Sequence, residues 1–94
     1  MKFTLTVKRK LSVTKFSEPA PVKSVSPDGS FEAASITFAR TAANGFIRQW
    51  AEGSGMKLRT QKDWVKNPKT KRFERQVTVQ NGASPETYVF TIEE

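Results

Sequence analysis

The chain has 94 residues, with 16 Lys and Arg against 9 Asp and Glu, and a formal net charge of +7. A chain this short supports one hydrophobic core, so we expect a single domain over residues 1–94. It contains no cysteine and no histidine, which excludes disulfides, zinc–thiolate centres and the catalytic triads or dyads that need either residue. The first residues lack the apolar run of a signal peptide or a membrane span, so the sequence predicts a cytoplasmic protein without a membrane partner.

The positive charge is concentrated in two segments. Residues 1–15 carry five Lys and Arg and no acidic residue, and residues 57–75 carry eight Lys and Arg against Asp63 and Glu74. The rest of the chain is therefore net acidic. Such segregation predicts a positive field on one part of the molecule, for which polyanions are the natural partners.

The N-terminal third is expected to contain strands and a connector. Alternating apolar residues predict either one strand over Phe3–Val13 or two strands joined by a turn at 8–10. Residues 17–29 hold three prolines and end in Ser-Pro-Asp-Gly, a turn sequence. We expect a connector here, with a short strand at 22–25.

A helix is predicted from Phe31 to about Glu52, with Ser30 as its N-cap and Glu32 in its first turn. Arg40 and Arg48 are expected on its exposed side, and Gly45 weakens the helix by about 1 kcal/mol relative to alanine. The apolar positions recur at spacings of three and four and predict a buried stripe. This stripe consists of Ile36, Ala39, Ala43, Ile47 and Trp50, widened by Phe38, Ala42 and Phe46.

Three further strands are predicted over residues 56–66, 71–80 and 87–92, with turns at 67–70 and 81–85. Because one helix is followed by consecutive strands and no β-α unit repeats, the pattern favours the α+β class. We expect a single helix packed on a mostly antiparallel sheet of four to five strands.

The segment Met56–Gln76 combines cations with Trp64 and Phe73. If 67–70 is the turn, these two rings fall on the same face of adjacent strands. One interpretation is a basic hairpin that binds phosphates and stacks bases or protein rings on its aromatic residues. The alternative is that both rings belong to the core while the lysines protect an exposed sheet edge.

The candidate residues for binding a partner or a nucleic acid come from this segment and from the basic triplet near the N-terminus. They are Lys8, Arg9, Lys10, Lys57, Arg59, Lys62, Trp64, Lys66, Lys69, Lys71, Arg72, Phe73 and Arg75. No glycine-rich phosphate loop and no paired acid and base occur in the sequence. We therefore predict no catalytic residue, no cofactor and no metal site.

Residues 32–43 read Glu-Ala-Ala-Ser-Ile-Thr-Phe-Ala-Arg-Thr-Ala-Ala. This segment resembles a helix of small phage-encoded anti-CRISPR proteins that act on type I-F surveillance complexes, in which a strand region precedes the helix and a basic, tryptophan-containing meander follows it. The resemblance implies an inhibitor in the host cytoplasm that docks on a CRISPR surveillance complex and obstructs target-DNA pairing. The present chain departs from that pattern by its greater length and its proline-rich connector.

Two functions follow as hypotheses. The first is a non-enzymatic, phage-type inhibitor that docks on a nucleic-acid-handling complex and blocks nucleic-acid access. The second is a direct, largely nonspecific DNA- or RNA-binding protein, whose affinity would fall steeply with salt. A third interpretation, an assembly subunit that oligomerises through strand edges, predicts a mass that depends on concentration.

Overall fold

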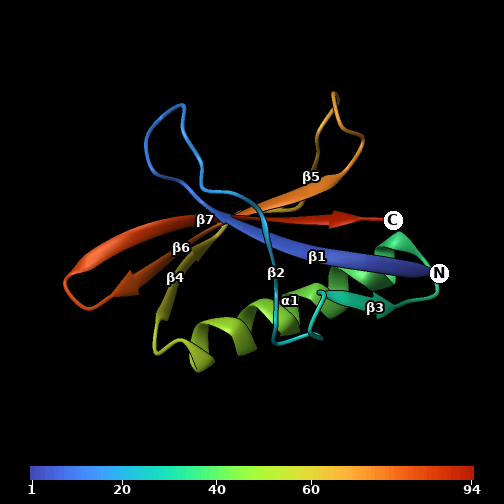
Figure 1. The fold of residues 1–94 in the computed structure, drawn as a ribbon, viewed down its shortest axis with the longest axis horizontal. Coiled ribbons are helices and arrows are strands. Elements are labelled where there is room, and N and C mark those ends of the chain that lie inside the picture. The colour runs from blue at the N-terminus through green and yellow to red at the C-terminus, as the bar shows by residue number, and fades with distance from the viewer.

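The computed structural model describes residues 1–94 as one helix packed on one antiparallel sheet (Figure 1). The elements in chain order are β1 (Lys2–Arg9), β2 (Ala20–Pro21), β3 (Ser30–Glu32), α1 (Ile36–Gly53), β4 (Lys57–Gln61), β5 (Val65–Lys66), β6 (Phe73–Asn81) and β7 (Ser84–Glu93). The expected α+β class is confirmed. No helix is long and apolar enough to cross a bilayer.

The sheet has seven strands instead of the expected four to five, because each of its edges is divided. The strand order is β2-β1-β7-β6-β4, while β3 also pairs with β1 and β5 also pairs with β6. The predicted strand over 56–66 is thus two strands, β4 and β5, and a register shift interrupts the pairing of β4 with β6 between Leu58 and Thr60. The β6–β7 hairpin turns through Gly82 and Ala83 alone, since Asn81 pairs with Ser84.

The hydrophobic core lies between α1 and one face of the sheet. The helix contributes small side chains at Ala39 and Ala43, which let larger residues such as Phe90 come close. Trp50 packs edge-to-face on Phe90 with ring centroids 5.0 Å apart. Phe38, predicted in the buried stripe, is 62% exposed because it lies at the margin of the helical face that meets the sheet.

The helix begins five residues later than predicted. Its N-cap is Ser35, whose hydroxyl accepts a hydrogen bond from the Phe38 amide. The predicted cap and first turn form β3 instead, in which Phe31 pairs with Phe3 of β1. The Phe31 ring lies 5.9 Å from that of Phe3 and 5.3 Å from that of Phe46, so packing across the sheet outweighs the local capping signal.

The N-terminal strand is shorter than the alternation predicts. β1 ends at Arg9, which pairs with Tyr88 of β7, and the following turn spans residues 11–15. Leu11 and Val13 are 59% and 87% exposed, because α1 and the rest of the sheet offer no apolar surface beyond the end of β1. In the connector, strand pairing falls at β2 and not over 22–25.

The predicted turn at residues 26–29 is present and is organised by Asp28. The Asp28 carboxylate accepts hydrogen bonds from the Ser30 hydroxyl at 2.6 Å, from the Ser30 amide and from the Ser26 hydroxyl. These bonds, led by that from the Ser30 side chain, lower the pKa of Asp28 to about 2. The carboxylate therefore stabilises the fold fully above its unfolded pKa of about 3.9, and this contribution is lost as the pH falls through the folded pKa.

Asp28→Asn is accordingly expected to melt at a lower temperature than the parent protein at neutral pH. The difference should shrink between about pH 4 and pH 2, as the parent carboxyl becomes protonated. Circular dichroism melts at several pH values measure this. Asp63→Asn is the matched control, since Asp63 is exposed and the structure gives it no hydrogen bond or ion pair. A difference in melting temperature between Asp28→Asn and the parent that does not change with pH would contradict the expectation.

Candidate binding groove

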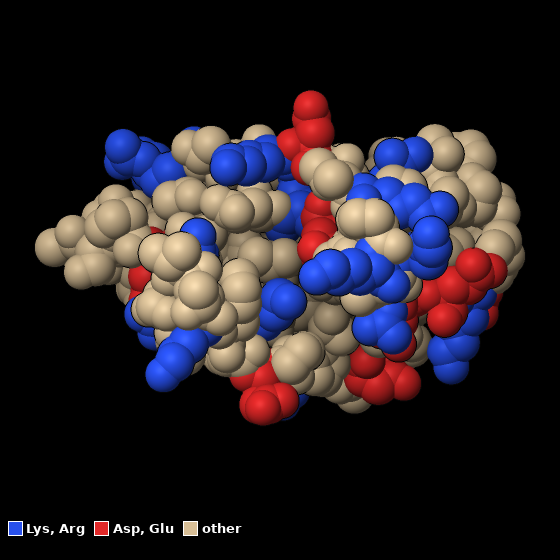
Figure 2. Space-filling view, turned by 90° about the horizontal axis from the view of Figure 1, so that it is seen from above, with Lys and Arg blue, Asp and Glu red and all other residues tan.

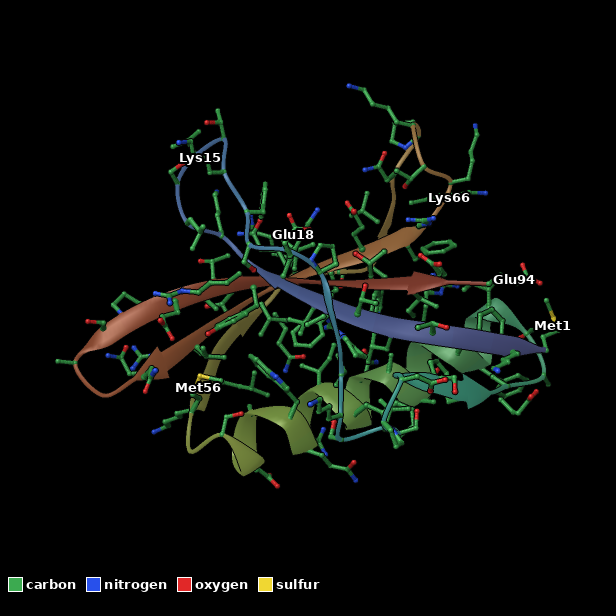
Figure 3. All side chains as sticks on the ribbon, in the orientation of Figure 1. Met1, Lys15, Glu18, Met56, Lys66 and Glu94 are labelled. Carbon is green, nitrogen blue, oxygen red and sulfur yellow. The ribbon has the colours of Figure 1, made fainter.

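Two loops leave the sheet on the side opposite α1 (Figure 1). We call residues 10–19, which connect β1 to β2, the N-terminal arm, and residues 62–72, which contain β5 and its turn, the hairpin arm. Figure 3 marks the first by Lys15 and Glu18 and the second by Lys66. The two basic segments of the sequence are thus partly brought together on one side of the fold.

Between the arms, the uncovered face of the sheet holds two adjoining cavities of about 410 and 200 Å³. Lys8 and Glu74 line both, so we treat them as one groove. The first cavity reaches from Phe16 of the N-terminal arm to Asn67 of the hairpin arm. The groove is lined by Thr6, Lys8, Phe16, Pro19, Lys62, Asp63, Val65, Asn67, Thr70, Arg72, Glu74, Gln76, Val89, Thr91 and Glu93.

The register of the three central strands explains the polar floor of the groove. Val89 pairs with Lys8 on one side and Gln76 on the other, and Thr91 pairs with Thr6 and Glu74 in the same way. Successive side chains of a strand point to opposite faces, so the neighbours of these residues in sequence form the core. The alternation that buries one face of the sheet therefore presents hydroxyl, amide and charged groups on the other.

The hairpin arm is held by Asn67, the first residue of the predicted 67–70 turn. Its side-chain oxygen accepts a hydrogen bond from the Lys69 amide at 2.9 Å, and its side-chain nitrogen donates to Glu74 at 3.3 Å. Lys71 takes a positive φ of 64° and donates its amide to the Asn67 carbonyl. These bonds connect the tip of the arm to the floor of the groove.

Most of the cations lack a carboxylate partner. Of the 16 Lys and Arg, only Arg9 and Arg72 form ion pairs, with Glu86 at 2.6 Å and Glu93 at 3.2 Å. Figure 2 looks onto the side of the arms and shows Lys and Arg atoms in several groups around fewer acidic atoms. The unpaired cations of the arms are Lys10, Lys15, Lys62, Lys66, Lys69 and Lys71. They are free to meet anions of a partner.

The aromatic residues of the hairpin segment face α1 and not the groove. Trp64 packs against the core and donates its indole N–H to the Asn44 side-chain oxygen at 2.9 Å. Phe73 lies beneath the guanidinium of Arg40, whose Cζ is 4.7 Å from the ring centroid. The two rings are not cross-strand partners, because Phe73 pairs with Lys66. Neither ring is available as an exposed stacking platform on the arm.

Arg75 joins these residues in a polar cluster between helix and sheet, which we call the seam: Arg40, Asn44, Trp64, Phe73 and Arg75. Arg75 donates to the same Asn44 oxygen as Trp64, and its Cζ is 5.9 Å from the Trp64 ring centroid. The Nε atoms of both arginines are buried without a partner. The seam therefore fixes the base of the hairpin arm to α1.

The other predicted site residues lie outside the groove. Arg9 is turned to the other face of the sheet, where Glu86 also accepts a hydrogen bond from the Tyr88 hydroxyl at 3.2 Å. Burial, followed by the Glu86 carboxylate, raises the pKa of Tyr88. Lys57 and Arg59 belong to the edge strand β4, and Lys57 lines a depression beside the end of α1.

Sequence reasoning missed Phe16, Lys15, Glu74 and Gln76 as site residues and Asn44 as a seam residue. Phe16 could have been identified from the sequence as an exposed ring, because it follows Lys15 in a segment beyond the last buried residue of β1. Glu74 and Gln76 alternate with Phe73 and Arg75, which identifies them as the opposite face of β6. Asn44 lies one helical turn after Arg40, but its partners are distant in sequence, so no local pattern reveals it.

No family model, curated protein or solved structure matches this chain. The structure also contains no group of three or more acidic side chains that could hold a metal ion. Function is therefore inferred from the groove, the arms and the placement of charge.

Proposed function

We propose that this protein is a non-enzymatic binding protein that docks on a nucleic-acid-handling complex through its two arms and blocks the access of nucleic acid to it. The observation that carries this proposal is the set of unpaired lysines on the two arms. The arms are far apart in the sequence, and both lie on the side opposite α1. Uncompensated charge of one sign attracts a polyanion and speeds its encounter with the protein.

A complex with a protein component is favoured by the N-terminal arm. Leu11 and Val13 are 59% and 87% exposed near its tip, between Lys10 and Lys15. Burying such a side chain on a protein surface gains about 1.5–3 kcal/mol, a contact that a phosphate backbone does not offer. The inhibitory role is proposed from the resemblance of residues 32–43 to the anti-CRISPR helix.

The second candidate function is direct binding to free DNA or RNA, which the number of unpaired arm lysines favours. It requires no protein partner. The logarithm of the affinity for duplex DNA would then fall by about 0.9 per neutralised phosphate for each tenfold rise in salt.

The test replaces Lys62, Lys66, Lys69 and Lys71 together by glutamine. The matched control replaces Lys23, Arg48, Lys57 and Arg59, which removes the same charge outside the arms. Binding to a purified type I surveillance complex is measured by biolayer interferometry, together with loading of its target DNA. Four exposed contacts at about 0.2–1 kcal/mol each give an expected loss of about fourfold to several hundredfold for the arm variant, with little change in the control.

Equal loss in both variants would show that the arms are not the contact surface. A parent protein that neither binds the complex nor slows DNA loading would overturn docking on this kind of machine. A complex that remains bound after nuclease treatment supports docking, whereas binding that disappears with the nucleic acid supports the second candidate.

A further inference from the structure

The floor of the groove and its two arms differ in chemistry. Six unpaired lysines occupy the arms, while the floor carries the carboxylate of Glu74, the amide of Gln76, the hydroxyl of Thr91 and a single ammonium group, that of Lys8. The Glu74 carboxylate accepts a hydrogen bond from Asn67, and no cation is paired with it. A ligand that fills the groove must therefore present different groups to the arms and to the floor.

A phosphate group is disfavoured on the part of the floor beside the Glu74 carboxylate. Two like unit charges about 5 Å apart repel by about 3 kcal/mol at an effective dielectric constant of 20. Glu74 and Asp63 both line the larger cavity, where Lys62 belongs to the hairpin arm and the Lys8 ammonium lies over the Phe16 ring. Glu93 in the smaller cavity is already offset by Arg72. The phosphates of a nucleic acid would thus run along the lysines of the arms.

Nucleobases match the floor. The Phe16 ring is 41% exposed and lines the larger cavity, with the Lys8 ammonium 4.7 Å from its centroid. An aromatic side chain stacks a base with a gain of about 1–3 kcal/mol. Gln76 offers both a donor and an acceptor to base edges, whereas the Asn67 oxygen already accepts from Lys69 and only one N–H of its amide remains. The cavities of about 410 and 200 Å³ are of the size that holds small ligands.

We infer that the groove seats a single-stranded segment of nucleic acid with its bases on the floor and its phosphates along the arms. This inference rests on the proposed function, whose partner contains nucleic acid. A duplex cannot bind in this way, because its bases are paired and stacked inside and its phosphates face outward.

Glu74 gives the groove a base preference. An ionised carboxylate only accepts hydrogen bonds, so it pairs with exocyclic amino groups such as the N4 amino group of cytosine. The only donor on the Watson–Crick edge of thymine or uracil is the N3–H, which lies between two carbonyl oxygens that the carboxylate repels. Cytosine-rich strands are therefore expected to bind more tightly than thymine-rich ones.

The test measures fluorescence polarisation of labelled oligo(dC), oligo(dT) and a mixed-sequence duplex of equal length at low salt. The parent protein should bind oligo(dC) about 5–100-fold more tightly than oligo(dT), the range expected for one hydrogen-bonded base contact. The duplex should bind more weakly than oligo(dC). Glu74→Gln should bring the two single strands within about twofold of each other, because the glutamine side chain both donates and accepts.

Phe16→Ala should weaken both single strands by about 5–100-fold and leave their ratio unchanged. The matched controls are Phe38→Ala, an exposed ring on α1, and Glu52→Gln, an exposed carboxylate near its end, and both should bind like the parent. Thermal melts establish that each variant is folded.

A duplex bound as tightly as oligo(dC), or a base preference that survives Glu74→Gln, would overturn the groove assignment and leave docking by the arms intact. The absence of binding to any oligonucleotide, with binding to the surveillance complex retained, would also overturn the groove assignment. The groove would then be assigned to a protein segment of the complex. The proposed function fails separately, when the parent protein neither binds the surveillance complex nor slows its loading of target DNA.

Discussion

Gly29→Ala is expected to lower the free energy of unfolding by about 2–4 kcal/mol, from backbone strain and from disturbed hydrogen bonds. Gly29 has φ +78°, a conformation that costs an L-residue about 1–2 kcal/mol. A Cβ atom at this position would also lie 2.5 Å from the Leu5 carbonyl oxygen. That contact cannot be relieved by rotating a side chain, because the atom belongs to the backbone of β1.

The cost of moving that backbone is set by the hydrogen bonds at Leu5. The Leu5 amide donates to the Gly29 carbonyl at 2.9 Å, and the Leu5 carbonyl accepts from the Val22 amide at 3.0 Å. These two bonds continue the edge of the sheet between β2 and β3. Disturbing either one removes about 1 kcal/mol.

Gly82→Ala is the matched control for this prediction. Gly82 also has a positive φ, of 64°, but no atom beyond its two chain neighbours lies within 4 Å of a Cβ placed there. Its replacement should cost only the backbone strain of about 1–2 kcal/mol. Urea unfolding of the two variants measures the difference, and equal losses would mean that the contact with Leu5 has no energetic effect.

Asn44→Ala is expected to destabilise the fold by about 2–4 kcal/mol, because it leaves two donors in the seam without an acceptor. The Asn44 oxygen accepts from the Trp64 indole and from Arg75, whose Nε atom already lacks a partner. The hairpin arm should also become more mobile, since Trp64 lies at its base. Urea unfolding gives the loss of stability, and hydrogen exchange of residues 62–72 gives the loosening of the arm.

Asn44→Asp separates the role of the acceptor from that of side-chain volume. The carboxylate keeps the acceptor and places a negative charge beside the Arg75 guanidinium, so this variant should retain more stability than Asn44→Ala. Gln49→Ala is a control on the same helix, because Gln49 is exposed and forms no side-chain hydrogen bond. If Asn44→Ala were as stable as Gln49→Ala, the seam would not hold the arm.

The sequence predicts those parts of the fold that depend on local periodicity. The spacing of Ala39, Ala43 and Ile47 identifies the buried side of the helix, and alternation identifies β6 and β7. The turn residues at 67–70 and around Gly82 locate both hairpins. These signals suffice for the α+β class, because each is contained within a few neighbouring residues.

The features that were mispredicted depend on contacts between distant segments. Ser30 and Ser35 both have the chemistry of a helix cap, and only the pairing of Phe31 with Phe3 decides between them. Leu11 and Val13 continue the alternation of β1, although the apolar surface beneath that strand has ended. Charge segregation indicated two basic segments, but not that the two arms within them leave the sheet from one face, nor that the hairpin rings turn toward α1.

The divided edges of the sheet have a consequence for the behaviour of the protein at high concentration. On one side β2 and β3 contain two and three residues, and on the other β4 and β5 contain five and two, with lysine or arginine on both of the latter. An incoming strand meets no long, regular row of open backbone groups on either side. The sheet therefore offers a poor template for fibril growth.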